Sequence, residues 1–167
     1  LVAGDYSSPL LTIAQHHYQN RVGLHLFDAQ AIPFTSKSFD VILLFEALYY
    51  IPDVECFFRE CSRLLRPGGV LLIATANKDL YDFNPSPHSH RYLGTIELHD
   101  ELTRLGYDVN CFGDTANNFL TARQRLLRPL KAIAARSGFI PQTMAAKKFL
   151  KRISKKSKYS CLLYTSP

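Results

Sequence analysis

The chain has 167 residues, of which 47% are hydrophobic and 20% are charged, as is typical of one soluble globular domain. No uninterrupted apolar stretch approaches the roughly 20 residues that a membrane span needs. The four cysteines show no metal-site spacing, so no metal is predicted, and they favour a reducing compartment. These features exclude integral membrane, collagen-like and disordered proteins.

Charge is unevenly distributed along the chain. Residues 1–114 contain 8 Lys and Arg and all 14 Asp and Glu, whereas residues 115–167 contain 12 basic residues and no acidic ones. The sequence therefore predicts an acidic domain over residues 1–114 and a basic helical extension over residues 115–159. Residues 160–167 fit neither pattern and stay unassigned.

Alternating apolar runs and turn signals predict the elements of the first domain. Strands are expected at residues 1–5, 22–27, 39–45, 70–75 and 107–112. Helices are expected to begin at caps formed by Ser8, Asp53 and Thr95, and the second should stop at residues 66–69, Arg-Pro-Gly-Gly. The continuous apolar run at residues 39–45 predicts a strand covered on both faces. This order predicts an α/β domain with a mostly parallel sheet.

The basic extension has a helical pattern of its own. Helices are expected at about residues 118–136 and 143–156, the second with basic side chains around a short apolar stripe.

Two acidic residues follow predicted strands. In an open α/β sheet, ligands bind at the carboxyl ends of the strands, which is where Asp5 and Asp28 are expected. A carboxylate there can accept hydrogen bonds from ribose hydroxyls or from a purine amine. The alternative is that each acid only caps the turn that follows it.

Five short motifs occur in one order and at natural spacing, although each is weak alone. They are Gly4-Asp5-Tyr6-Ser7, Asp28-Ala29-Gln30-Ala31-Ile32-Pro33-Phe34, Ser38-Phe39-Asp40-Val41-Ile42, Ile51-Pro52-Asp53 and Leu64-Leu65-Arg66-Pro67-Gly68-Gly69. Over about residues 1–113 the chain resembles class I S-adenosylmethionine-dependent methyltransferases, in the type 11 or quinone-biosynthesis-like group. The resemblance implies a Rossmann-like fold, S-adenosylmethionine as cofactor, and in-line methyl transfer to a small-molecule or lipid-linked acceptor.

The resemblance implies cofactor contacts for six residues, which are Asp5, Tyr6, Asp28, Ala29, Leu44 and Phe45. Asp5 matches the acid that holds the ribose, with Tyr6 beside the adenine. Asp28 and Ala29 match the acid and the small residue at the adenine edge. Leu44 and Phe45 match the floor beneath the methionine part and the transferred methyl.

The family's first strand and its glycine-rich loop would lie before Leu1. In the family that strand is central, between the strands that carry Asp5 and residues 39–45. We therefore expect a gap in the sheet. We also expect this chain to be a fragment that alone folds poorly, binds cofactor poorly and is inactive.

Candidate catalytic residues follow the strand at residues 39–45. Methyl transfer depends mainly on aligning the acceptor atom with the methyl group. A general base can increase the rate of such a reaction by a further factor of about 10²–10⁴. Glu46 and Tyr50 are the candidates by position, although Glu46 could equally make a structural hydrogen bond. Tyr50 and its neighbour Tyr49 fall where many relatives carry a pair of histidines at the pocket rim.

The loop at residues 77–92 could cover the acceptor pocket. His88 and His90 lie in it and are either pocket residues or solvated loop residues. Its aromatic residues, Tyr81, Phe83 and Tyr92, either wall the acceptor site or only pin the loop.

The basic residues between Lys147 and Lys158 leave three interpretations open. They form a solvated helical face, a helix that rests on an anionic membrane surface, or a weaker nucleic-acid contact. The expected location is cytoplasmic, with peripheral membrane association as the variant that suits a lipid-linked acceptor.

Two other functions remain open at this point. A nicotinamide-dependent oxidoreductase also places an acid after its second strand. A non-catalytic, partner-binding remnant of a methyltransferase would need no glycine-rich loop.

Overall fold

The computed structural model describes residues 1–19, 21–80, 83, 85–112 and 161–166. The predicted helices at residues 118–136 and 143–156 lie outside these ranges. The elements, in chain order, are β1 (Val2–Asp5), α1 (Ser8–Tyr18), β2 (Gly23–Leu26), β3 (Phe39–Phe45), the 3-10 helix η1 (Leu48–Tyr50), α2 (Val54–Leu64), β4 (Leu65–Thr75), α3 (Thr95–Arg104), β5 (Asp108–Phe112) and β6 (Cys161–Ser166). Among the described residues, no helix is long and apolar enough to cross a membrane.

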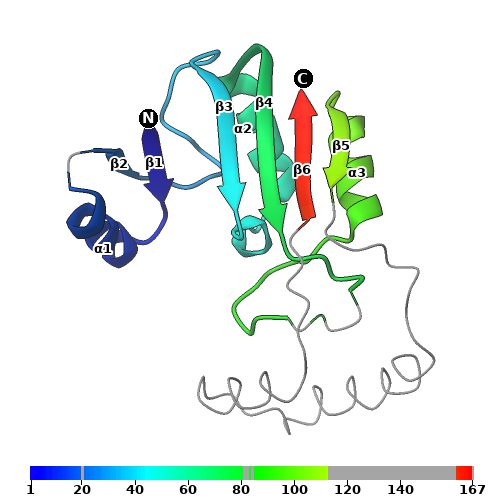
Figure 1. Cartoon of the computed structure of the whole chain (residues 1–167), viewed down its shortest axis with the longest axis horizontal. Helices are drawn as coiled ribbons and strands as arrows, with labels where there is room; N and C mark the ends of the chain where they lie inside the picture. The colour runs from blue at the N-terminus through cyan, green and yellow to red at the C-terminus, as the bar shows by residue number, and fades with distance from the viewer. Residues whose placement is uncertain (20, 81–82, 84, 113–160, 167) are drawn as a thin grey trace, which may run out of the picture.

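Two sheets are formed by the described strands (Figure 1). β1 and β2 pair in parallel, and β3 pairs in parallel with β4 in a second sheet of order β3-β4-β6-β5. β6 is antiparallel to both of its neighbours. This confirms the predicted α/β class, since parallel strands alternate with helices over most of the described chain.

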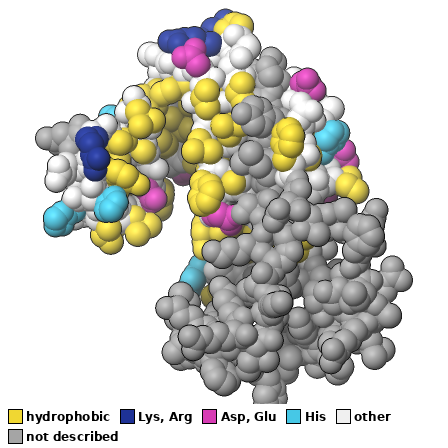
Figure 2. Space-filling model, viewed as in Figure 1, with side chains coloured by type: hydrophobic (Ala, Val, Ile, Leu, Met, Phe, Trp, Pro, Cys, Tyr) yellow, Lys and Arg dark blue, Asp and Glu magenta, His cyan; other side chains and the backbone are white. Residues whose placement is uncertain are grey.

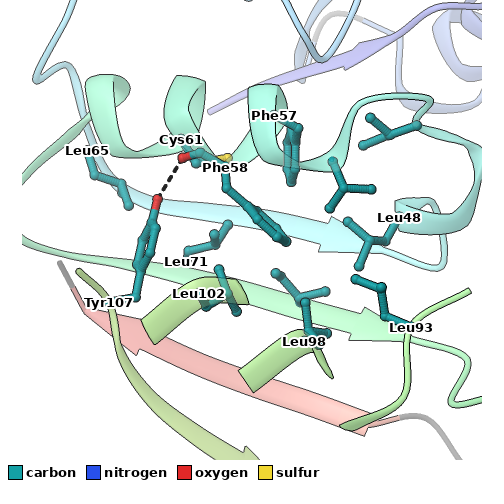
Figure 3. Packing of buried hydrophobic residues seen from close by; sticks show 13 residues of the cluster. Leu48, Phe57, Phe58, Cys61, Leu65, Leu71, Leu93, Leu98, Leu102 and Tyr107 are labelled. Atoms are coloured by element: carbon teal, nitrogen blue, oxygen red, sulfur yellow. Dashed lines mark hydrogen bonds between the residues drawn. The ribbon is translucent and has the colours of Figure 1, made fainter. Parts of the chain in front are cut away.

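The hydrophobic core lies between the larger sheet and two helices, α2 and α3 (Figure 3). Helix α2 buries one stripe of side chains, at Val54, Phe57, Phe58, Cys61 and Leu64. Leu98 and Leu102 of α3 and Leu71 and Ile73 of β4 complete the centre, all at most 1% exposed. The Tyr107 hydroxyl donates to the Phe58 carbonyl over 2.9 Å, which ties the start of β5 to α2.

The helix caps differ in detail from the sequence prediction. Asp53 caps α2 as expected, because its carboxylate accepts from the Cys56 N–H at 2.9 Å. Helix α1 is capped by Ser7 and not by Ser8, and helix α3 by Gly94 and not by Thr95. Each of the two predicted caps is instead the first residue of its helix, so the boundaries move by one residue only.

The prediction that β3 is covered on both faces is wrong for the described residues. Ile42 and Leu44 pack against the core, whereas Val41, Leu43 and Phe45 are 53%, 63% and 68% exposed. The described helices α2 and α3 lie on the same side of this sheet, and Figure 2 shows hydrophobic side chains on the opposite face. An apolar run thus sets the strand but does not show which elements cover it.

The two sheets are not joined by strand pairing. β1 pairs with β2 and β3 with β4, and among the described strands none pairs β1 to β3. Figure 1 shows β1 and β3 side by side and pointing the same way, with an interval between them. This is where the resemblance places the family's first strand.

Two segments of the larger sheet depart from the sequence prediction. Residues 66–69 do not separate α2 from the strand, because β4 already begins at Leu65 and contains them as an irregularity opposite Asp40. Gly68 takes a positive φ of 77° there, which glycine adopts without strain. Cys161–Ser166, unassigned from sequence, form β6 between β4 and β5.

Candidate functional site

Three acidic residues follow strands whose carboxyl ends point to one edge of the molecule. β1, β3 and β4 run in the same direction in Figure 1, and β2 is parallel to β1. Asp5 ends β1, Asp28 follows β2 by two residues, and Glu46 follows β3 directly. The topology therefore brings Asp5, Asp28 and Glu46 to the edge at which α/β sheets bind ligands.

Asp5 is exposed and held by a short turn. Its Oδ1 accepts from the Ser7 N–H at 2.7 Å, and its carbonyl accepts from the Phe27 N–H at 3.2 Å. Gly4 lets the Phe27 ring approach, since the ring occupies the place that a side chain at residue 4 would take. Tyr6 is 79% exposed next to this carboxylate.

Asp28 is half-buried and fixed by one neighbour, Gln30. The Gln30 backbone N–H donates to Asp28 Oδ1 at 2.8 Å, and Gln30 Nε2 lies 3.1 Å from each carboxylate oxygen. Gln30 Oε1 in turn accepts from the Asp53 N–H at 2.9 Å, at the start of α2. Ala29 lies between them and packs against the hydrophobic core.

The loop that follows Asp28 is clamped onto α2 by Glu60 and Arg63. Glu60 accepts from the Ile32 N–H at 3.0 Å, while Arg63 donates to the carbonyls of Ile32 and Phe34 at 2.9 and 2.8 Å. The same two side chains form an ion pair of 2.8 Å. The hydrogen bond from Arg63 lowers the pKa of the Glu60 carboxyl, against the opposing effect of burial. This clamp fixes the course of the loop at residues 32–34.

Glu46 terminates β3 in an uncommon backbone conformation. Its φ is 52°, which only a few per cent of non-glycine residues adopt, and its N–H donates to the Ala74 carbonyl at 2.7 Å. Its carboxylate accepts from the Tyr49 hydroxyl at 3.3 Å. Such local strain is often found at functional sites. The preceding Leu44 faces the core, and Phe45 faces outward.

An aromatic cluster surrounds Tyr49. The Tyr49 ring stacks on Tyr92 with centroids 4.6 Å apart, and Phe83 meets Tyr92 edge-on at 4.7 Å. The Tyr50 ring lies 4.6 Å from Tyr49 and is 47% exposed. Burial, and then the charge of Glu46, raise the pKa of the Tyr49 hydroxyl. The hydroxyl therefore stays protonated and acts as a donor.

The loop histidines are solvent-exposed, but one is tied to the site through its backbone. The His90 N–H donates to the Tyr49 carbonyl at 2.8 Å, and the Tyr92 hydroxyl accepts from the Ser86 N–H at 3.0 Å. Phe83 and Tyr92 thus pin the loop to η1, one of the two alternatives for these rings. Tyr81 lies outside the described residues.

Sequence reasoning missed Gln30 and the Glu60–Arg63 pair as parts of this site, and it did not predict the contact of Tyr49 with Glu46. Gln30 stands inside a quoted motif, yet its contact with Asp53 spans 23 positions and has no local signal. No group of three or more His, Cys, Asp or Glu residues that could hold a metal lies within the described part of the chain.

Comparison with known proteins finds similarity to methyltransferases in part of the sequence and in the fold. Residues 1–73 match the family model described as a methyltransferase domain. The chain is 32% identical over 83 residues to a ubiquinone biosynthesis O-methyltransferase of Sinorhizobium medicae, covering 48% of this chain and 34% of that protein. It is 24% identical over 164 residues to a malonyl-[acyl-carrier protein] O-methyltransferase of Hahella chejuensis, covering 92% of this chain and 59% of that protein.

A solved structure extends the likeness to the fold of nearly the whole chain. A methyltransferase-like protein from Bacillus halodurans superposes with a TM-score of 0.62 at 18% identity, over 99% of this chain and 81% of its own. At this identity the likeness shows the fold alone.

The fold is Rossmann-like, and residues 1–73 are similar in sequence to methyltransferase domains. The curated relatives include ubiquinone biosynthesis O-methyltransferases, to which the chain is similar over about half of its length. The chain spans between about a third and three fifths of the length of the curated relatives named above.

Proposed function

We propose that the complete gene product containing this chain transfers a methyl group from S-adenosylmethionine to a small-molecule or lipid-linked acceptor. The observation that carries the proposal is the placement of Asp5 and Asp28 at the carboxyl ends of two adjacent parallel strands. Residues 1–114 would form the methyltransferase domain, and residues 115–159 a basic extension. Acceptors of both kinds are proposed because the relatives include a ubiquinone biosynthesis O-methyltransferase and a malonyl-[acyl-carrier protein] O-methyltransferase.

The residues present fit the adenosine half of the cofactor. The Ser7 N–H occupies one acceptor position of the exposed Asp5 carboxylate, and the others can accept from two vicinal ribose hydroxyls. Asp28 would accept from the adenine edge, with the small Ala29 next to it, and Tyr6 would lie beside the base. When bound, S-adenosylmethionine supplies a methyl group already activated by its sulfonium.

The acceptor side would be built from the end of β3 and from η1. Phe45, exposed at the end of β3, would line the path of the methyl group, and Leu44, packed against the core, would support this strand end from the other face. Alignment of reactants can lower a barrier by about 7–11 kcal/mol. Glu46 would accept the proton that an acceptor hydroxyl loses when its oxygen is methylated. Tyr50, exposed beside Tyr49, would contact the acceptor at the rim.

The first test is calorimetry of S-adenosylhomocysteine with this 167-residue chain and with the complete gene product. We expect binding by the complete product, loss of binding in Asp5→Ala, and little binding by the shorter chain. Asp40→Ala is the matched control, because Asp40 is exposed at the other end of β3 and pairs only with surface Arg66 among the described residues. Absence of binding in every sample would refute the enzyme and favour a partner-binding role.

We also propose that the basic residues between Lys147 and Lys158 contact an anionic membrane surface during catalysis on a lipid-linked acceptor. Only their charge supports this, since they lie outside the described residues. Co-sedimentation of the complete product with vesicles should rise with the fraction of anionic lipid and fall with salt. Binding that is indifferent to anionic lipid would contradict it.

A further inference from the structure

We propose that Gln30 is a positioning residue that orients the Asp28 carboxylate to accept one N–H from the exocyclic amine of the bound purine. The inference rests on the proposed function and extends it, because it assigns adenine selectivity to a side chain that touches no ligand. It also connects the adenine edge to α2.

The side-chain amide of Gln30 is fixed at both ends. Its Oε1 accepts from the Asp53 N–H at 2.9 Å, so its Nε2 must face Asp28, where it lies 3.1 Å from both oxygens. Rotating the amide by half a turn would set two donors against each other at Asp53 and oxygen against oxygen at Asp28. The network thus permits one orientation of the amide.

The backbone of Gln30 is also held. Its N–H donates to Asp28 Oδ1 at 2.8 Å, and its carbonyl accepts from the Cys56 thiol at 3.4 Å. Asp53 and Cys56 belong to the first turn of α2, a helix whose apolar face is buried in the core. Gln30 therefore links the Asp28 carboxylate to a helix that is packed into the core.

Counting acceptor positions indicates what the carboxylate can still bind. An ionised carboxylate offers about four lone-pair positions, and Gln30 fills two on Oδ1 and one on Oδ2. The position that remains, on Oδ2, accepts a single donor. An exocyclic amine provides such a donor, whereas a purine with hydrogen at that carbon does not.

The test compares two ligands by calorimetry on the complete gene product. One is S-adenosylhomocysteine, and the other is its 6-desamino analogue, which has hydrogen in place of the exocyclic amine. We expect the complete product to favour the first by roughly tenfold, the scale of one hydrogen bond to a charged group. In Gln30→Leu the ratio of the two affinities, S-adenosylhomocysteine over its 6-desamino analogue, should fall to near one. The affinity for the analogue should change less than the affinity for S-adenosylhomocysteine.

Control variants separate positioning from folding and from the proposed function. Gln15→Leu makes the same chemical change on exposed α1 and should keep the ratio. Gln30→Glu preserves the shape and the contact with Asp53 but removes the donor to Asp28, and it should also lose the ratio. Asp28→Ala should lose it as well.

Three results would overturn the inference. Loss of the ratio in Asp28→Ala but not in Gln30→Leu and Gln30→Glu removes the positioning role and leaves the proposed function standing. A complete product that binds both ligands equally refutes amine recognition by Asp28 but not methyl transfer. Failure to bind S-adenosylhomocysteine at all refutes both.

Discussion

The Tyr49 hydroxyl donates to the Glu46 carboxylate across the turn that ends β3, over 3.3 Å. This contact joins the first residue after β3 to the 3-10 helix η1, and it restricts where the Glu46 carboxylate can point. The raised pKa of Tyr49 keeps the donor protonated across the working range.

Tyr49→Phe should lower kcat/KM of the complete product, because the Glu46 carboxylate loses the hydroxyl that restricts its position. We expect a loss of about 2- to 10-fold, the scale of one hydrogen bond. Tyr18→Phe, on α1, should leave kcat/KM unchanged. An unchanged kcat/KM in Tyr49→Phe would mean that this hydrogen bond has no part in catalysis.

Glu60→Gln should destabilise the chain near neutral pH by about 1 kcal/mol, because it weakens the hydrogen bonds to Ile32 and Arg63. The pKa of Glu60 is lowered in the folded state, so its contribution is present above the unfolded pKa and is lost as pH falls through the folded one. Urea unfolding should thus show a difference between parent and variant that disappears in acid. Glu55→Gln, at an exposed ion pair, should change little at any pH.

Leu102→Ala should lower the free energy of unfolding by about 2–5 kcal/mol, because Leu102 is fully buried between α3 and β4. The matched variant Leu10→Ala lies on α1, where the side chain is 55% exposed, and should cost at most about 0.5 kcal/mol. Equal effects in urea unfolding would show that α1 is buried in solution, contrary to the fold described.

Gly4→Val should disrupt the β1–β2 pair, because the new side chain would meet the Phe27 ring. We expect a loss of about 1–3 kcal/mol in the free energy of unfolding, with weaker binding of S-adenosylhomocysteine through displacement of Asp5. The double variant Gly4→Val with Phe27→Ala should recover part of both. No recovery would place the strain at the glycine backbone and not at the ring.

The sequence predicted an element well where the residues that define its limits lie within the element or directly beside it. The run at residues 39–45 has polar residues at both ends, and its strand has the predicted limits. Asp53 and the apolar spacing after it defined α2 in the same way. Asp5 and Asp28 were placed at strand ends because strand and acid are adjacent in sequence.

The features that sequence did not predict depend on partners far along the chain. Val41, Leu43 and Phe45 are exposed because no described helix packs on their face of the sheet. β4 begins at Leu65, earlier than predicted, because Leu65 pairs with Phe39. The contacts of Gln30 with Asp53 and of Arg63 with Phe34 join segments separated by more than 20 positions. The residue pattern within one segment cannot predict a hydrogen bond to a distant one.

The strand β6 has a consequence for how the chain is made. β4 and β5 each pair with β6 and not with each other. Among the described strands, β5 is therefore joined to the rest of the larger sheet only through Cys161–Ser166. During synthesis these residues leave the ribosome after every other element described, and until then β4 and β5 each have an unpaired edge. This sheet can therefore be completed only after Cys161–Ser166 have been synthesised, so its assembly depends on contacts between residues far apart in sequence.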